Sequence, residues 1–133
     1  MKFSICIPNY NYGRYIGDTI RSALNQEADV EVLVADNAST DNSVAVVEEI
    51  GDARVRLRLN RWNVGFAGNL DRACAGATGD RMLLLSSDDL AGPEAFATYT
   101  SLARELGEGA DQAVFCSGTY EVDGEGRITG ESF

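Results

Sequence analysis

Two adjacent carboxylates, Asp88 and Asp89, lie just after an apolar run that ends at Leu85. Ser86 and Ser87 separate this run from the acids. Neighbouring carboxylates repel each other, so such a pair persists where a positive group lies beside it or where water screens it fully. A strand that ends in small hydroxyl residues and two acids therefore indicates half of a metal-binding or phosphate-binding site.

The elements that would hold this site follow from the spacing of apolar residues. Short apolar runs bounded by Pro, Gly or Asn predict strands, and apolar residues three or four positions apart predict helices. The expected strands cover 3–7, 30–35, 54–59, 81–85 and 113–116, the expected helices cover 14–25, 41–50, 66–77 and 93–106, and residues 120–128 are expected to form a hairpin. This alternation predicts an α/β fold with a mostly parallel sheet flanked by helices in three α/β/α layers, followed by a C-terminal β-hairpin.

Two of these elements carry expectations about individual side chains. Strict alternation over 54–59 predicts an edge strand whose arginines, Arg54, Arg56 and Arg58, form a solvated face and nothing more. In the helix over 66–77, Phe66 and Leu70 are expected to face the core.

The chain has 133 residues, which predicts one domain over 1–133. Hydrophobic residues make up 44% and charged residues 24%, which are ordinary values for a globular protein. No helix follows the expected hairpin to cover it. We therefore expect the chain to be the front part of a longer protein.

Charge and composition exclude several classes of function. The net charge of −10 argues against nucleic acid or an anionic membrane surface as the main partner. The sequence contains no histidine, which excludes histidine acid–base chemistry and histidine-ligated metals within this chain. No apolar run approaches the length of a membrane span.

Three cysteines, Cys6, Cys74 and Cys116, are far apart and lie among apolar residues. An odd number in this context favours buried free thiols over disulfides. Free thiols favour a reducing compartment, and no signal peptide precedes the first strand. We expect a cytoplasmic protein, with peripheral association at the inner face of the membrane left open.

Polar residues follow every expected parallel strand up to residue 89. In open α/β sheets, ligands bind beyond the carboxyl ends of the strands. These ends carry Pro8-Asn9-Tyr10-Asn11, Asp36-Asn37, Asn60-Arg61-Trp62-Asn63 and Ser86-Ser87-Asp88-Asp89. The glycine-rich turn of a dinucleotide site is missing, and a Walker loop is excluded because Lys2 is the only lysine. An acid-tipped strand that holds Mg²⁺ or Mn²⁺ remains, since both ions prefer oxygen ligands.

The order and spacing of four motifs resemble the family 2 glycosyltransferases of the GT-A fold, whose fold is Rossmann-like. The motifs are Pro8-Asn9-Tyr10-Asn11, Asp36-Asn37-Ala38-Ser39-Thr40-Asp41, Asn63-Val64-Gly65 and Ser87-Asp88-Asp89. Any one of them is weak, but four in order over about a hundred residues form a specific pattern. The resemblance implies a nucleotide-sugar donor, of UDP, GDP or dTDP type, bound over the first four strands.

The resemblance also assigns roles to single positions. It implies that Pro8, Asn9 and Tyr10 frame the nucleobase and that Asp36 and Asn37 contact it, with an amide at 37 where the family has a second acid. Asn63 and Gly65 would hold the nucleotide, and Arg61 could reach a phosphate. Asp88 would be the metal ligand, with Asp89 second. Ser86 replaces the first acid of the family's Asp-x-Asp motif, and Ser86 or Ser87 could still hydrogen-bond to the ribose.

The resemblance implies an inverting transfer of the sugar to an acceptor hydroxyl, in the synthesis of a cell-surface polysaccharide or similar glycan. The acceptor would be a glycan or a lipid-linked sugar. The general base is expected beyond Phe133, so no catalytic base is assigned here. Two alternatives stay open: a non-catalytic nucleotide-sugar-binding module or truncated fragment, and a nucleotidyltransferase, although the glycine-rich basic loop that the latter needs is missing.

Overall fold

The computed structural model describes residues 1–114 and 117–132, and it divides into two compact units, Met1–Thr100 and Ser101–Phe133. Cys116 and part of the strand expected over 113–116 lie outside the described residues. Residues 113 and 114 are not in a strand. The expectation of a single domain remains a prediction, and the two units are described separately.

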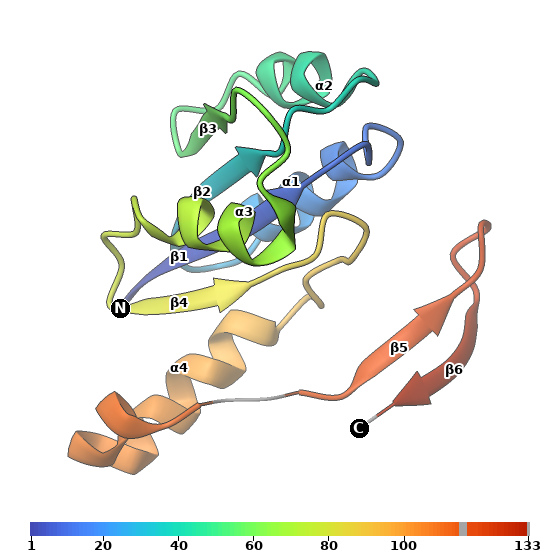
Figure 1. Ribbon diagram of the computed structural model, residues 1–133. Coiled ribbons are helices and arrows are strands. Elements are labelled where there is room, and N and C mark those ends of the chain that lie inside the picture. Colours follow the sequence, from blue (N-terminus) through green and yellow to red (C-terminus); the bar gives the residue numbers. More distant parts are fainter. Residues whose placement is uncertain (115–116, 133) are drawn as a thin grey trace. The chain divides into compact units, whose positions relative to one another are not determined.

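The first unit is built on a parallel sheet with the strand order β3-β2-β1-β4 (Figure 1). Its strands are β1 (Lys2–Asn9), β2 (Asp29–Asp36), β3 (Val55–Leu59) and β4 (Arg81–Leu84). β1 pairs with β2 along its whole length, from Lys2 opposite Asp29 to Asn9 opposite Asp36. The sequence predicted all four strands. The parallel α/β prediction is confirmed.

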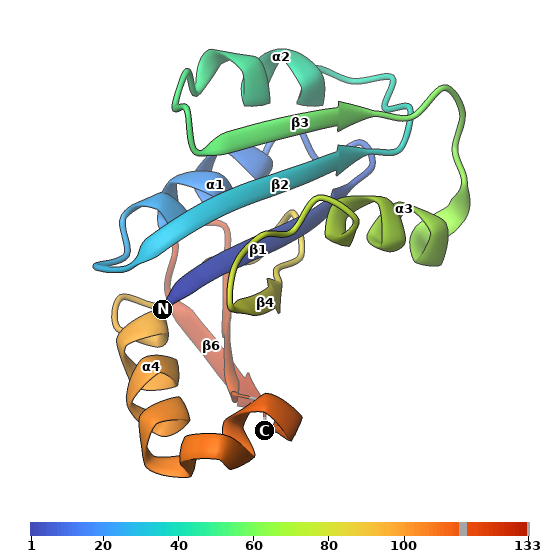
Figure 2. The same ribbon diagram turned by 90° about the vertical axis from the view of Figure 1, so that its left-hand side faces the viewer.

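Helices cover both faces of this sheet (Figure 2), as predicted. They are α1 (Ile16–Leu24), α2 (Ser43–Glu49), α3 (Gly65–Cys74) and α4 (Ala95–Leu106), the last of which begins in the first unit and ends in the second. On one face, the β-branched residues of β1 and β2 pack against Ile16, Ile20 and Val47. On the same side, the ring of Phe96 stacks on that of Phe3, with 5.0 Å between their centroids.

The other face of the sheet has fewer buried apolar residues and is covered by α3. Cys6, Leu33 and Ala35 of the strands pack against Ala73 of the helix. Phe66 is 69% exposed, so its expected place in the core is wrong. Asn69, one turn further on, is buried instead.

Two of the cysteines, Cys6 and Cys74, are free thiols, as expected. Burial raises the pKa of the Cys6 thiol to about 12, and the neighbouring Cys74 adds to the rise. Cys6 therefore stays protonated and behaves as a small core residue.

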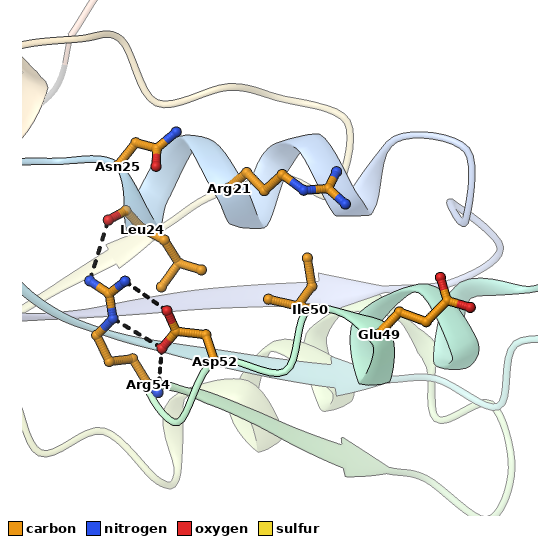
Figure 3. A pocket seen from close by; sticks show the side chains of 7 residues that line it. All are labelled: Arg21, Leu24, Asn25, Glu49, Ile50, Asp52 and Arg54. Carbon is orange, nitrogen blue, oxygen red and sulfur yellow. Dashed lines mark hydrogen bonds and ion pairs between the residues drawn. The ribbon is translucent and has the colours of Figure 1, made fainter.

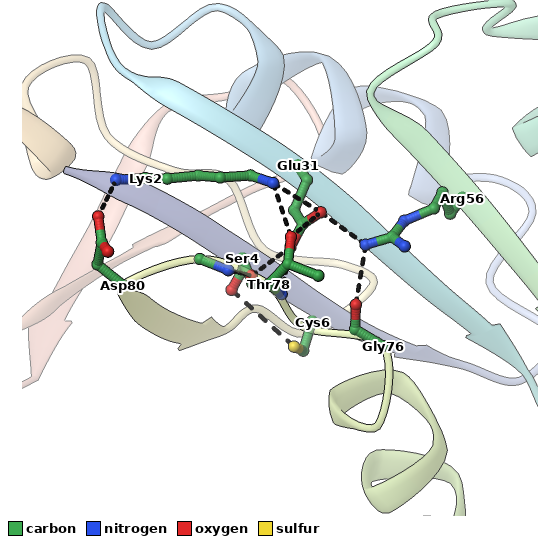
Figure 4. A network of polar contacts seen from close by, with 9 residues as sticks. Lys2, Ser4, Cys6, Glu31, Arg56, Gly76, Thr78 and Asp80 are labelled. Atoms are coloured by element: carbon green, nitrogen blue, oxygen red, sulfur yellow. Dashed lines mark hydrogen bonds and ion pairs between the residues drawn. The ribbon is translucent and has the colours of Figure 1, made fainter.

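A buried carboxylate joins the amino ends of the strands (Figure 4). Glu31 of β2 accepts hydrogen bonds from Ser4 Oγ at 2.6 Å and from the main-chain N–H of Thr78 at 2.7 Å. It also forms ion pairs with Lys2 Nζ at 3.1 Å and with Arg56 Nη2 at 2.6 Å. Arg56 was expected only to face solvent, and this is wrong because the strand beside it presents a buried charge that needs a partner.

β3 forms one edge of the sheet, as its alternating pattern predicted. All three arginines of the pattern are exposed, Arg56 included, so the solvated face is confirmed. Arg54 is nonetheless engaged, because it pairs with Asp52 at 2.7 Å and donates to the main-chain oxygen of Leu24.

The second unit contains a 3-10 helix, η1 (Gly107–Gln112), and an antiparallel hairpin of β5 (Thr119–Val122) and β6 (Ile128–Ser132). The hairpin confirms the prediction for 120–128. Asp123 organises its turn by accepting hydrogen bonds from the main-chain N–H groups of Glu125 and Arg127. Among the described residues, no helix is both long and apolar enough to cross a membrane.

Candidate nucleotide-binding edge

The candidate site lies at the carboxyl edge of the parallel sheet. The strand order reverses between β1 and β4, because β2 and β3 extend the sheet on one side of β1 and β4 on the other. Loops after such strands diverge at the reversal point and leave room for a ligand. The loops after β2 and β3 leave the sheet at the same edge (Figure 2).

Asn9 and Asp36 meet at the ends of β1 and β2. Asn9 Nδ2 donates to Asp36 Oδ1 at 2.9 Å, and both side chains are buried. Asp36 also accepts from the main-chain N–H of Ser39 at 2.9 Å and from Ser39 Oγ at 2.6 Å. The structure thus brings these two predicted site residues together through a shared serine. Asn9 Oδ1 is buried without a hydrogen-bond partner among the described residues.

The loops after β1 and β2 are fastened to each other at two further points. Asn11 Oδ1 accepts a hydrogen bond from the main-chain N–H of Thr40 at 2.8 Å, and Asp41 Oδ2 accepts one from that of Gly13 at 2.8 Å. Burial works to raise the pKa of Asp41, but the bonds from Ser43 and Gly13 outweigh it and lower the pKa. The carboxylate is therefore the form that holds the two loops together.

Asn37 holds the loop before α3. Its Nδ2 donates to Asn63 Oδ1 at 2.8 Å and to the main-chain oxygen of Gly65 at 3.4 Å, while its Oδ1 accepts from Val64 N–H at 2.8 Å. Gly65 has a φ of +78°, a conformation that glycine adopts without strain. Three of the predicted site residues, Asn37, Asn63 and Gly65, are thus joined directly.

The acidic turn follows β4. Ser87 is buried, and its main-chain oxygen accepts a hydrogen bond from Thr19 Oγ1 of α1 at 3.0 Å. The N–H of Asp89 donates to the oxygen of Ser86 at 3.2 Å, which closes a tight turn. Asp88 and Asp89 are exposed, and neither carboxylate has a hydrogen bond or ion pair with any described residue. Both acids are thus free to receive a cation.

The described residues contain no group of three or more acids, cysteines or histidines that could hold a metal ion by themselves. Mg²⁺ and Mn²⁺ are usually held by one or two carboxylates together with substrate phosphates. The exposed pair after β4 supplies that number of carboxylates.

The remaining predicted residues lie on the same edge without joining these networks. Pro8 is buried in β1, and Tyr10 is 44% exposed beyond its end. Arg61 is exposed, and its guanidinium carbon lies 6.0 Å from the centre of the Trp62 ring. Among the described residues, no hydrogen bond links the turn at Ser86–Asp89 to the Asn9–Asp36 pair.

Two further polar residues, Asn60 and Asn69, belong to the site's framework and were missed as such. Asn69 Nδ2 donates to the main-chain oxygens of Ala35 and Asn9, at 2.9 and 3.2 Å. Asn60 directly follows β3, and the sequence predicted no role for it. The available sequence signal was Asn69 itself, a polar residue at a core-facing position of the helix that follows an asparagine-rich loop.

A cavity in the first unit lies away from this edge. It measures about 370 Å³ and is lined by Arg21, Leu24, Asn25, Glu49, Ile50, Asp52 and Arg54 (Figure 3). These residues end α1 and α2 and precede β3, so the cavity lies at the amino edge of the sheet. Its arginine at 54 is already held by Asp52 and Leu24. We do not assign it to the nucleotide site.

Comparison with known proteins identifies the family of the chain. The profile of the family described as "Glycosyl transferase family 2" matches residues 4–131. A UDP-Glc:α-D-GlcNAc-diphosphoundecaprenol β-1,3-glucosyltransferase of Escherichia coli is 32% identical over 129 residues, which are 96% of this chain and 49% of that enzyme. An abequosyltransferase of Salmonella typhimurium is 33% identical over 95 residues, covering 67% of this chain and 28% of that enzyme. The chain therefore spans less than half the length of these relatives.

Solved structures give the same result. S. aureus TarS 1-349 in complex with UDP-GlcNAc superposes with a TM-score of 0.73 and 28% identity, over 79% of this chain and 32% of that one. The fold is also shared by a mannosyltransferase of Pyrobaculum calidifontis, at a TM-score of 0.68 and 24% identity over 74% of this chain and 31% of that one. The predicted GT-A fold is confirmed. By its sequence profile and its parallel sheet, the chain belongs to glycosyl transferase family 2.

Proposed function

We propose that this chain is the nucleotide-sugar-binding part of an inverting glycosyltransferase that transfers a sugar to an acceptor hydroxyl in glycan synthesis. The observation that carries the proposal is the carboxyl edge itself. There, hydrogen-bonded loops form a rigid frame, and two unpaired carboxylates follow the neighbouring strand. A ligand with a flat polar base at one end and a metal-bound diphosphate at the other suits these two parts.

The base end of the donor is assigned to the frame formed by Pro8, Asn9, Tyr10 and Asp36. The carboxylate of Asp36 is fixed by three hydrogen bonds, which gives a base a pre-organised partner at little entropic cost. Asn63 and Gly65 form the loop that closes over the nucleotide, and Arg61 reaches a phosphate. UDP, GDP and dTDP sugars are the candidate donors. The E. coli relative is named for UDP-Glc, and the two solved structures hold UDP-GlcNAc and GDP-Man.

The diphosphate end is assigned to the acidic turn. Asp88 is the metal ligand and Asp89 the second, while the hydroxyls of Ser86 and Ser87 bind the ribose. When bound, Mg²⁺ or Mn²⁺ supplies the positive charge that stabilises the nucleoside diphosphate as it leaves. The Pyrobaculum structure holds Mn²⁺ with GDP-Man. Here the chain's own contribution is to fix the turn, through Thr19 and Ser87, so that its carboxylates stay in place.

Inversion at the anomeric carbon requires a base that takes the proton of the acceptor hydroxyl. We assign no residue of this chain to that role. The acceptor is proposed to be a glycan or lipid-linked sugar, as the name of the E. coli relative suggests. A cytoplasmic location is proposed on the free thiols Cys6 and Cys74.

Isothermal titration calorimetry with UDP, GDP and dTDP, each with and without Mn²⁺, tests the proposal. We expect one nucleotide to bind more tightly when Mn²⁺ is present. Asp88→Ala should abolish most of the gain due to Mn²⁺, whereas the matched variant Asp80→Ala, at the other end of β4, should retain it. The proposal fails if no nucleotide binds, or if the gain due to Mn²⁺ survives Asp88→Ala.

A further inference from the structure

A buried asparagine of α3 contacts the main chain of two strands at the candidate site. Asn69 is only 2% exposed. Its Nδ2 donates to the oxygen of Ala35 at 2.9 Å and to that of Asn9 at 3.2 Å. These carbonyls belong to paired strands, β1 and β2, at the point where the site residues Asn9 and Asp36 stand opposite each other.

The other end of the Asn69 amide continues into the third strand. Asn69 Oδ1 accepts a hydrogen bond from Asn60 Nδ2 at 2.7 Å, just after β3. Asn60 Oδ1 in turn accepts from Arg72 Nη1 at 2.8 Å, so α3 contacts Asn60 through two of its residues. Asn60 is also buried, and both polar atoms of its side chain are satisfied.

From Asn60 the network reaches the loop that precedes α3. Asn60 Nδ2 donates to Asn37 Oδ1 at 3.2 Å, and Asn37 holds Asn63, Val64 and Gly65 through the bonds described above. We call Asn37, Asn60 and Asn69 the amide network. It joins the ends of β1, β2 and β3 to one another and to the loop at 63–65.

We propose that Asn69 is a positioning residue for the nucleotide. It acts by fixing the separation of the ends of β1 and β2 and, through Asn60 and Asn37, the place of the loop at 63–65. The inference rests on the proposed nucleotide-binding function. It concerns the base end of the ligand, because no hydrogen bond among the described residues connects the amide network to Asp88 or Asp89.

The location of these contacts separates positioning from general support of the helix. α3 already packs on the sheet through Ala73, which lies against Cys6, Leu33 and Ala35. The bonds of Asn69 are instead made at the last residue of β1 and the next-to-last residue of β2. A shift of about 1 Å in a binding group there is enough to cost a large factor in binding or rate. An amide is needed because Asn69 must donate to two carbonyls and accept from a third group at once.

The test compares nucleotide binding in two variants of Asn69 with a control that weakens the opposite edge. Asn69→Ala removes all three bonds. Asn69→Asp keeps the size of the side chain and its acceptor, but places a carboxylate against two carbonyl oxygens. Ser4→Ala is the control, since Ser4 Oγ bonds to Glu31 and to the N–H of Gly79 at the amino edge.

Calorimetry gives the dissociation constant of the bound nucleotide with and without Mn²⁺, at a temperature where circular dichroism shows each variant to be folded. We expect both Asn69 variants to raise the dissociation constant tenfold or more, by the order of magnitude typical for a misplaced binding group. The ratio between the constants with and without Mn²⁺ should stay at the wild-type value. Ser4→Ala should lower the melting temperature and leave the constant within about twofold.

The inference is overturned if a folded Asn69 variant binds the nucleotide with a dissociation constant within twofold of the wild-type value. It is also overturned if Ser4→Ala, at an equal loss of melting temperature, weakens nucleotide binding as much as the Asn69 variants do. It is also overturned if Asn69→Asp loses the gain in affinity due to Mn²⁺. If Asn69→Ala does not fold, Asn69→Asp alone decides the test. A wild-type chain that binds no nucleotide would refute the proposed function itself. These two failures are therefore distinguishable.

Discussion

The charge of Glu31 should stabilise the fold by an amount that can be worked out from its surroundings. Burial works to raise the pKa of this carboxyl, but hydrogen bonds from Ser4, Thr78 and Lys2 outweigh burial and lower the pKa from 4.5 to about 2. Each unit of difference between the folded and unfolded pKa corresponds to about 1.4 kcal/mol. The ionised form therefore contributes about 3 kcal/mol to the free energy of unfolding.

The sign of the pH dependence follows from the lowered pKa. The unfolded chain takes up the proton near pH 4.5 and the folded one only near pH 2, so the contribution is complete above pH 4.5 and is lost as the pH falls towards 2. Glu31→Gln removes the charge at nearly constant volume. We expect it to lower the free energy of unfolding by about 3 kcal/mol at pH 7, and the gap to shrink by about 2 kcal/mol at pH 3.

Urea unfolding followed by circular dichroism at pH 7 and pH 3 measures this gap. The difference between wild type and variant is the quantity to compare, because other carboxyl groups of the chain, among them Asp41, also have a lowered pKa. Glu48→Gln, on the exposed side of α2, is the matched control and should change the free energy by less than about 0.5 kcal/mol. An equal gap at both pH values would refute the reasoning, since the effect would then come from shape and not from charge.

Two other substitutions test the local structure. Asn37→Asp should lower the free energy of unfolding by about 1–3 kcal/mol at pH 7, because a carboxylate cannot donate to Asn63 Oδ1 or to the oxygen of Gly65; urea unfolding measures this, and a neutral result would contradict the assigned amide orientation. Phe66→Ser should change it by less than about 0.5 kcal/mol because the ring is mostly exposed; a loss of several kcal/mol would mean that the ring is buried after all.

The sequence predicted the four parallel strands and the polar edge because both depend on local pattern. Strands β1 and β2 are apolar runs. The first was expected to end before Pro8 but continues to Asn9, and the second ends at Asp36, just before Asn37. The side of α3 that faces the sheet was predicted less well. Phe66 fits an apolar period of 3.6, but Asn69 takes the inward position one turn later.

The local pattern marks Asn69 only as a polar residue at a core-facing position, and its role was not predicted because that role depends on partners distant in the sequence. An asparagine is costly to bury alone and becomes favourable only when its donors and acceptor are matched. Its partners Ala35 and Asn9 are 34 and 60 residues away. The same holds for Arg56, whose pattern indicates solvent while its head group reaches the buried carboxylate of Glu31.

The two edges of the sheet are held by different kinds of bond, and salt weakens these two kinds to different extents. At the amino edge, Lys2 and Arg56 meet Glu31 as full charges, and the cationic partners are partly open to solvent. Ionic strength weakens such pairs. The amide network at the carboxyl edge is built of neutral side chains apart from Arg72, so it offers little for salt to screen. Added salt should therefore weaken the ion pairs at the amino edge first and leave the amide network at the carboxyl edge nearly unchanged.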